Sequence, residues 1–126
     1  MHITIDEESR VPIYQQIANE IKRLIVGGEL PPETALPTVR QIAGDLGVNF
    51  NTVATAYRDL QEEGLLTVRH GSGAVVRGRQ SDRRGAEELR APLRTALAQL
   101  MLAGHPRTAV LHIVREELTK LVKGEK

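Results

Sequence analysis

The residues best suited to chemistry in this sequence are polar side chains of the kinds that recognise nucleic-acid bases and phosphates. An asparagine can pair with adenine through two hydrogen bonds, a threonine can donate or accept, and an arginine can bind phosphate or guanine. One short segment combines all three types in Asn49, Asn51, Thr52, Thr55 and Arg58, and Arg40 precedes it. Placed on one face of a helix, these side chains would suit contact with duplex DNA.

These polar residues interleave with apolar residues at helical spacing. The predicted buried stripe consists of Val53, Ala56, Tyr57 and Leu60. Asn49 can cap this helix at its start, and Gly64 ends it. The polar residues at 51, 52, 55 and 58 are left on the opposite side of the helix.

A shorter helix is predicted just upstream. Thr38 and Gln41 fit a capping box, in which the two side chains satisfy amides that the helix start leaves unpaired. Its buried stripe consists of Val39, Ile42, Ala43 and Leu46. Gly47 ends this helix, and the turn over residues 47–49 leads into the next one.

The helical period stops after Gly64, and a short hairpin is predicted next. Residues 65–68 and 74–76 are aliphatic or β-branched runs, and residues 69–73 form a glycine-containing turn between them. The turn carries Arg69, His70 and Gly71. Two short helices followed by such a hairpin form a winged helix-turn-helix, whose second helix enters the major groove of DNA.

An amphipathic helix is predicted before this unit, from Pro12 in its first turn to the glycine pair at 27–28. Its apolar positions are Ile13, Ile17, Ile21, Leu24 and Ile25. Residues 1–78 are therefore predicted to form an N-terminal winged helix-turn-helix domain. The predicted fold class is mainly α with a small β-hairpin.

Residues 79–126 are predicted to form a short linker and two helices that meet at Gly104. Pro92 either kinks the first of these helices or marks a later start. Their apolar stripes include Leu93, Leu97 and Leu100, then Val110, Ile113, Val114, Leu118 and Leu121. About forty residues enclose little core alone. We therefore expect this two-helix hairpin to dimerise with a second copy of the chain.

Composition excludes several classes of function. The 126 residues contain no cysteine, and only 2% are aromatic, which argues against thiolate chemistry and base-stacking platforms. No nucleophile–base pair or phosphate loop is present, so we expect neither an enzyme nor a cofactor. His105 and His112 could share a helix face, but no carboxylate at ligand spacing completes a metal site. The sequence shows neither a membrane span nor a signal peptide, so a reducing cytoplasm is the expected location.

A series of motifs occurs in a fixed order along the first three fifths of the chain. They are Pro-Ile-Tyr-Gln-Gln-Ile at 12–17, Gly-Glu-Leu at 28–30, Leu-Pro-Thr-Val-Arg at 36–40, Leu-Gly-Val-Asn at 46–49, Asn-Thr-Val-Ala at 51–54, Tyr-Arg-Asp-Leu at 57–60, Glu-Gly-Leu at 63–65 and Gly-Ser-Gly at 71–73. From residue 11 to about 77 the chain closely resembles the GntR superfamily of bacterial transcription regulators. The helical tail resembles the YtrA subfamily, whose small C-terminal region serves dimerisation.

The resemblance implies a homodimeric repressor that binds double-stranded DNA at an inverted-repeat operator. By position it implies DNA contacts at Arg40, Asn49, Asn51, Thr52 and Arg58, and at the wing residues His70 and Gly71. It further suggests control of a transporter operon, including the regulator's own gene. Some family members carry arginine at the positions of Phe50 and Ala54, so base contacts made there by long basic side chains are absent from this chain.

Several alternatives remain open from the residues themselves. The first 78 residues carry 7 basic and 10 acidic side chains, a net charge of −3, which favours a winged helix that binds protein instead of DNA. Arg58 could pair with Glu62 instead of phosphate. Phe50 could pack against the helix pair or touch a thymine methyl group. A dimer cleft could also bind a small-molecule effector, whose identity the sequence does not give.

Overall fold

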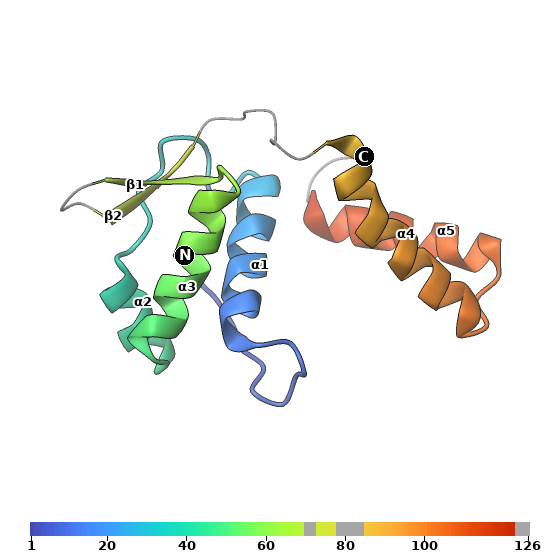
Figure 1. Cartoon of the computed structure of the whole chain (residues 1–126), viewed down its shortest axis with the longest axis horizontal. Coiled ribbons are helices and arrows are strands. Elements are labelled where there is room, and N and C mark those ends of the chain that lie inside the picture. The colour runs from blue at the N-terminus through green and yellow to red at the C-terminus, as the bar shows by residue number, and fades with distance from the viewer. Residues whose placement is uncertain (70–72, 78–84, 123–126) are drawn as a thin grey trace. The chain divides into compact units, whose positions relative to one another are not determined.

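The computed structural model describes residues 1–69, 73–77 and 85–122 (Figure 1). Its elements are α1 (Ile13–Val26), α2 (Val39–Leu46), α3 (Phe50–Glu62), β1 (Leu66–Arg69), β2 (Gly73–Val76), α4 (Ala86–Leu102) and α5 (Arg107–Leu121). The chain divides into two compact units, Met1–Ser81 and Asp82–Lys126. The predicted class, mainly helical with one small hairpin, is confirmed.

Helix α1 begins one residue later than the sequence predicted. Pro12 has an extended backbone, with φ −56° and ψ 148°, so it occupies the N-cap position and not the first turn. The segment before it is tied to α1 by Gln16. The Gln16 Oε1 atom accepts the Asp6 amide at 2.8 Å, and its Nε2 group donates to the carbonyl oxygens of Asp6 and Val11, each at 2.9 Å. These bonds hold the N-terminal segment beside α1, where Ile3 is buried.

The helix-turn-helix formed by α2 and α3 follows the predicted capping residues. The Thr38 hydroxyl accepts the Gln41 amide at 3.1 Å, and the Gln41 side chain accepts the Thr38 amide at 2.8 Å. Gly47 ends α2 with φ 68°, a left-handed conformation that glycine adopts without strain. Asn49 caps α3. The capping box, the glycine stop and the asparagine cap are all confirmed.

The hairpin is shifted slightly from its predicted limits, and it gains a third segment. Strands β1 and β2 pair antiparallel from Leu66 opposite Val76 to Arg69 opposite Gly73. The segment at 33–36 pairs with β2 as well, because the Leu36 amide donates to the Ala74 carbonyl at 2.8 Å and the Val76 amide donates to the Thr34 carbonyl at 2.9 Å. Residues 30–33, Leu-Pro-Pro-Glu, favour an extended, turn-rich connection. Its two prolines obscured this edge pairing.

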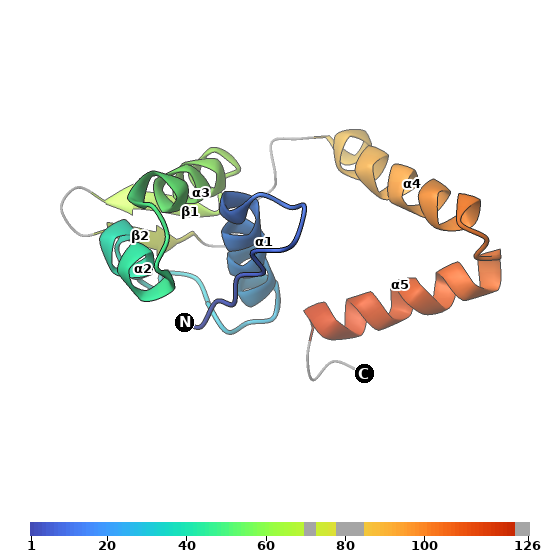
Figure 2. The same cartoon turned by 90° about the horizontal axis from the view of Figure 1, so that it is seen from below.

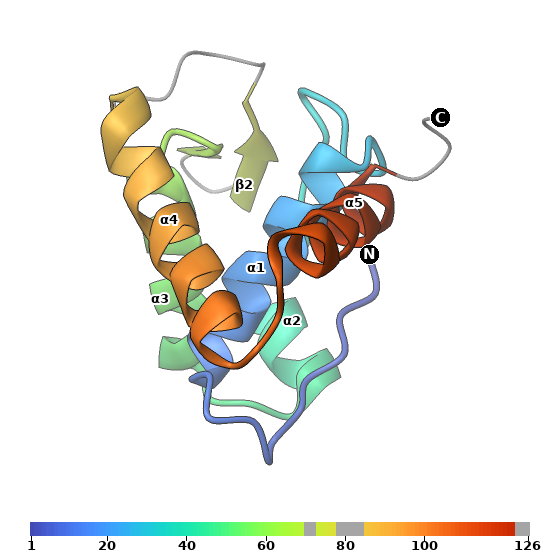
Figure 3. The same ribbon diagram turned by 90° about the vertical axis from the view of Figure 1, so that its right-hand side faces the viewer.

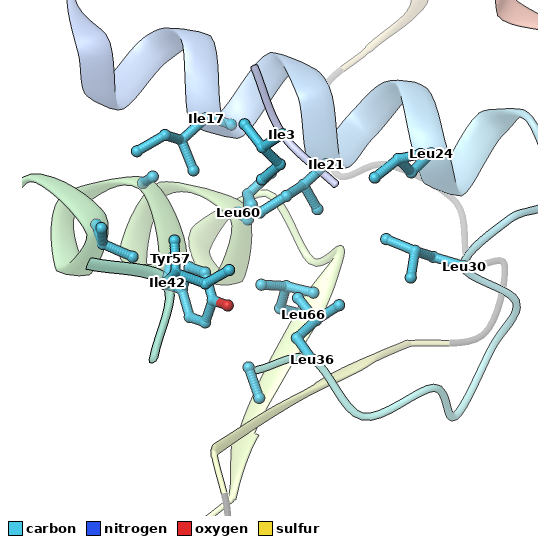
Figure 4. Close-up of a cluster of buried hydrophobic side chains, with 14 of the residues drawn as sticks. Ile3, Ile17, Ile21, Leu24, Leu30, Leu36, Ile42, Tyr57, Leu60 and Leu66 are labelled. Atoms are coloured by element: carbon cyan, nitrogen blue, oxygen red, sulfur yellow. The ribbon is translucent and has the colours of Figure 1, made fainter. Parts of the chain in front are cut away.

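The core of the first unit lies between α1, α3 and the hairpin (Figure 4). Ile17 and Ile21 from α1, Leu60 from α3 and Leu66 from β1 are almost fully buried. No buried polar residue occurs in the described part of the chain, so the core is held mainly by apolar packing. This packing fixes α3 by one face and leaves its opposite face toward solvent.

One polar contact joins α3 to the start of α2. The Tyr57 hydroxyl donates to the carbonyl oxygen of Pro37 at 2.6 Å, and Tyr57 itself is buried. We expect Tyr57→Phe to lower the free energy of unfolding by about 1–2 kcal/mol, because the partly buried Pro37 carbonyl would lose its hydrogen-bond partner. Urea unfolding measures this change. Tyr14→Phe is the matched control, since no described hydrogen bond involves the Tyr14 hydroxyl; an equal loss in both variants would contradict the assignment.

Burial also raises the pKa of the Tyr57 hydroxyl above its ordinary value of about 10. The folded protein therefore holds this proton more tightly than the unfolded chain does. The resulting stability is complete below pH about 10 and is lost as the pH rises further. Urea unfolding at about pH 9 and about pH 11 should show a larger loss for the natural protein than for Tyr57→Phe. Equal losses would show that Tyr57 does not contribute to the alkaline sensitivity.

The second unit is an αα-hairpin of α4 and α5, which diverge at a wide angle from the turn that joins them (Figures 2 and 3). Gly104 makes this turn with φ 104°. Pro92 lies inside α4, six residues after Ala86, so the helix starts upstream of the proline and continues through it. Neither these helices nor α1–α3 are long and apolar enough to cross a membrane.

Candidate nucleic-acid interface

The candidate reading surface is the side of α3 that faces away from the core. All four residues of the predicted apolar stripe, Val53, Ala56, Tyr57 and Leu60, are buried. On the other side, Asn51 and Arg58 are exposed, whereas Thr52 and Thr55 are half-buried. The sequence therefore placed the two faces of α3 correctly. A helix held by one apolar face with amides, hydroxyls and a guanidinium on the other can present hydrogen-bonding groups to base edges.

Asn49 has a structural role in the free protein. Its Oδ1 atom accepts the Asn51 backbone amide at 2.7 Å, which satisfies one of the amides left unpaired at the start of α3. The amide nitrogen of its side chain has no described bond and can still donate. The remaining amides of this helix start add a partial positive charge, which favours a nearby phosphate.

Thr55 connects the two outer residues of the reading surface. Its hydroxyl donates to the Asn51 carbonyl at 2.9 Å and accepts a hydrogen bond from the Arg58 guanidinium at 3.2 Å. Arg58 therefore folds back along its own helix. In the described part of the chain it forms no ion pair with Glu62, contrary to the alternative drawn from their spacing. The Thr55 hydroxyl already uses its proton inside the helix, so toward a base it can act chiefly as an acceptor.

Arg40 lies on α2 near the helix start, and its side chain is exposed. No described acidic group pairs with it, so its guanidinium is available to an external anion. The capping box of Thr38 and Gln41 fixes the backbone on both sides of it. An exposed guanidinium on the first helix of a helix-turn-helix is suited to a phosphate of the DNA backbone, because that helix crosses the backbone.

We expect Arg40→Ala to weaken binding to all DNA sequences alike and to reduce the salt dependence of binding by about one counterion per half-site. A phosphate contact carries no base information, so base preference should stay unchanged. Affinity titrations at several salt concentrations measure the slope. Arg115→Ala, on the exposed surface of α5, removes the same charge and should leave the slope unchanged. Altered base preference with an unchanged slope in Arg40→Ala would contradict a phosphate role.

Of the three predicted wing residues, only Arg69 lies among the residues that the structure describes. Arg69 is the last residue of β1 and pairs with Gly73 in the strand register. His70 and Gly71 lie outside the described residues, as do the linker arginines at 79, 83 and 84. DNA contacts by Arg69, His70 and Gly71 therefore stay predictions.

Phe50 is only half covered by the rest of the chain. It is the first residue of α3, and it is 49% exposed. Packing against the helix pair and contact with a thymine methyl group therefore both stay open for Phe50. An apolar ring is thus added to the reading surface.

The sequence missed the role of Pro37 in this site. Its carbonyl accepts the Tyr57 hydroxyl and so links the middle of α3 to the residue before the α2 cap. A tyrosine on an otherwise aliphatic stripe was the available signal, because a buried phenol needs a hydrogen-bond partner.

The predicted dimerisation residues are unevenly covered within a single chain. Val110 is buried, and Leu97, Leu100, Ile113 and Val114 are half-buried. Leu93 is 53% exposed, Leu118 is 56% exposed, and Leu121 is also exposed. The hairpin therefore leaves part of its apolar surface in water. His112 lies 3.4 Å from Glu116, and no group of three metal ligands occurs among the described residues.

Comparison with known proteins bears on this arrangement. A model of the gntR family of bacterial regulatory proteins matches residues 13–76, which contain α1, the helix-turn-helix and the hairpin. The chain belongs to the GntR family. This membership confirms the resemblance drawn from the motifs at 12–73. It also means that the chain is a winged-helix, DNA-binding transcription regulator and not an enzyme.

The GntR similarity extends into the helical tail. The chain is 32% identical to the transcriptional repressor YtrA of Bacillus subtilis, over 98% of this chain and 97% of that protein. A solved GntR-family YtrA from Sulfolobus acidocaldarius is 43% identical, with a TM-score of 0.64 over 76% of this chain and 97% of the other. The predicted likeness to YtrA proteins is therefore confirmed.

A third relative was solved with DNA. The DNA-binding domain of AraR, in complex with its operator ORX1, is 28% identical, with a TM-score of 0.54 over 60% of this chain and 95% of the other. The solved relative is thus a DNA-binding domain that is similar to 60% of this chain. The alternative of a winged helix without DNA binding is not favoured by these relatives.

Proposed function

We propose that this GntR regulator is a homodimeric repressor that binds an inverted-repeat operator. The observation that carries the proposal is the apolar surface of α4 and α5 that one chain leaves exposed, including Leu93 and Leu118. A second copy of the same hairpin is the simplest cover for it. Two copies related by a two-fold axis present two equivalent reading helices, which require two equivalent half-sites.

Each copy would use its elements in different ways. The start of α3 would enter the major groove, where Asn51, Thr52 and Thr55 face base edges. Arg40, Asn49 and Arg58 would contact phosphates or bases at the rim of the groove. The wing residues Arg69, His70 and Gly71 would approach the neighbouring groove or backbone. These roles rest on the exposure of the α3 polar face and on the positional match to the GntR motifs.

Repression would follow from occupancy of the promoter, because a bound dimer blocks polymerase. The name of the B. subtilis relative, a transcriptional repressor, supports repression over activation. The likeness to the YtrA group supports control of a transporter operon that includes the regulator's own gene. We place this activity in the cytoplasm, where operator DNA is accessible. No step of the mechanism requires a cofactor.

Transcription in vitro from the promoter upstream of the regulator's own gene tests repression. Transcript yield should fall as the protein is added, in parallel with operator occupancy measured by footprinting on the same template. A template with a scrambled operator is the control and should stay active. Unchanged or increased transcript at full occupancy would contradict the repressor assignment.

A further inference from the structure

The ring of Phe50 is only half covered by the part of the chain that the structure describes. It is the only phenylalanine in the sequence, and it stands at the first position of α3. About half of its surface is exposed, at 49%. A large apolar side chain at this place is covered only when another molecule binds there.

The neighbours of Phe50 indicate which molecule that is. Phe50, Ala54 and Arg58 are spaced by four residues and therefore form one row along α3. The row is apolar at the start of the helix and cationic further along. The parallel row holds Asn51 and Thr55. The apolar patch of Phe50 and Ala54 is thus continuous with the hydrogen-bonding residues that face DNA in the proposed function.

The major groove of DNA offers one apolar group to such a patch, the C5-methyl group of thymine. We propose that Phe50 determines operator specificity by packing its ring against the methyl group of a thymine beside the base read by Asn51. The methyl group of Ala54 lines the same contact. The inference rests on the proposed placement of α3 in the major groove. A protein covering Phe50 is the competing occupant.

Deoxyuridine substitution tests this contact, because deoxyuridine differs from thymidine only by lacking the methyl group. Each thymine of a selected operator is replaced in turn, and the affinity of the full-length protein is measured. We expect one thymine in each half-site at which removal of the methyl group lowers affinity about fourfold. Phe50→Ala should weaken binding to the parent operator and lose most of the discrimination between the thymine and deoxyuridine forms, with only the Ala54 methyl group left at the contact.

Three controls distinguish a contact between Phe50 and the thymine methyl group from an effect of the substitution on the fold. Phe50→Leu, which keeps an apolar side chain, should retain part of the discrimination. Val26→Ala removes a similarly exposed apolar residue on α1, at 53% exposure, and should discriminate as the natural protein does. Thermal unfolding of Phe50→Ala should match the natural protein, because the ring lies outside the core.

The outcomes distinguish this inference from the proposed function. If the natural protein binds the operator but no thymine responds to methyl removal, the Phe50 inference alone is overturned. The same conclusion follows if Phe50→Ala still discriminates fourfold, and a protein partner then becomes the better occupant. If the natural protein binds no operator, both the proposed function and the inference fail.

Discussion

Replacing Leu93 and Leu118 together with aspartate should make the protein monomeric and lower its operator affinity by about 100-fold or more. Both leucines are more than half exposed in the single chain, at 53% and 56%, so neither supports the interior of its own hairpin. In the proposed dimer the side chain of each leucine is buried, which stabilises the dimer by roughly 1.5–3 kcal/mol per side chain. Aspartate would place four unpaired charges in that interface, two from each chain.

The monomer is expected to lose DNA affinity because its reading helix is no longer joined to that of a second chain. In a dimer the second half-site is bound at a high effective concentration, which raises affinity by about 10²–10⁴-fold without a new contact. A monomer keeps its reading surface and should still bind a half-site weakly. Sedimentation velocity measures the oligomeric state, and fluorescence anisotropy with whole and half operators measures the affinities.

Thr95→Asp combined with Thr119→Asp is the matched control. Both threonines are exposed on the same two helices. Thr95 is rotated by about 200° from Leu93, and Thr119 by about 100° from Leu118, so neither points in the direction of its leucine. This control should stay dimeric and bind the whole operator as the natural protein does. An unchanged dimer in the leucine variant would mean that the interface lies elsewhere in the chain.

Asn51→Ala should relax base preference at one position in each half-site, where discrimination should fall by about 5- to 150-fold. The Asn51 side chain is exposed on the reading face, and its backbone carbonyl is bonded to Thr55. Only its side-chain amide is removed by the substitution, so α3 should keep its position. Competition binding with operators changed at each base pair measures the preference.

Asn19→Ala, on the exposed face of α1, is the control for this change. Its side chain pairs with Gln15 on the same helix and lies outside the reading surface. This variant should keep the full base preference. Uniform weakening of Asn51→Ala across all sequences would mean that Asn51 contacts the backbone of the DNA and not a base.

Local signals in the sequence explain why the helix-turn-helix was predictable. Thr38 and Gln41 specify the start of α2, and Gly47 specifies its end, because each acts through bonds to its immediate neighbours. The stripe that ends at Leu60 has one unbroken helical period, so it identified the buried face of α3. The exposed face of α3 was then predicted as the side of the helix that lacks the apolar stripe.

Contacts between distant segments were not predictable in the same way. The pairing of the 33–36 segment with β2 depends on tertiary packing, and the prolines nearby suggested a loop. The bond from Tyr57 to Pro37 spans twenty residues. The spacing of residues in the sequence therefore predicted which helix carries each candidate DNA-binding residue. The tertiary packing determines which of those side chains are exposed.

Selection of operators from a random pool of duplex DNA tests the central claim most directly. The purified natural protein is used, and the number of chains bound per selected duplex is measured by sedimentation. We expect the enriched sequences to share an inverted repeat and each duplex to bind two chains. An enriched site without two-fold symmetry that binds a single chain, or no enriched sequence at all, would contradict the account of a dimeric operator reader.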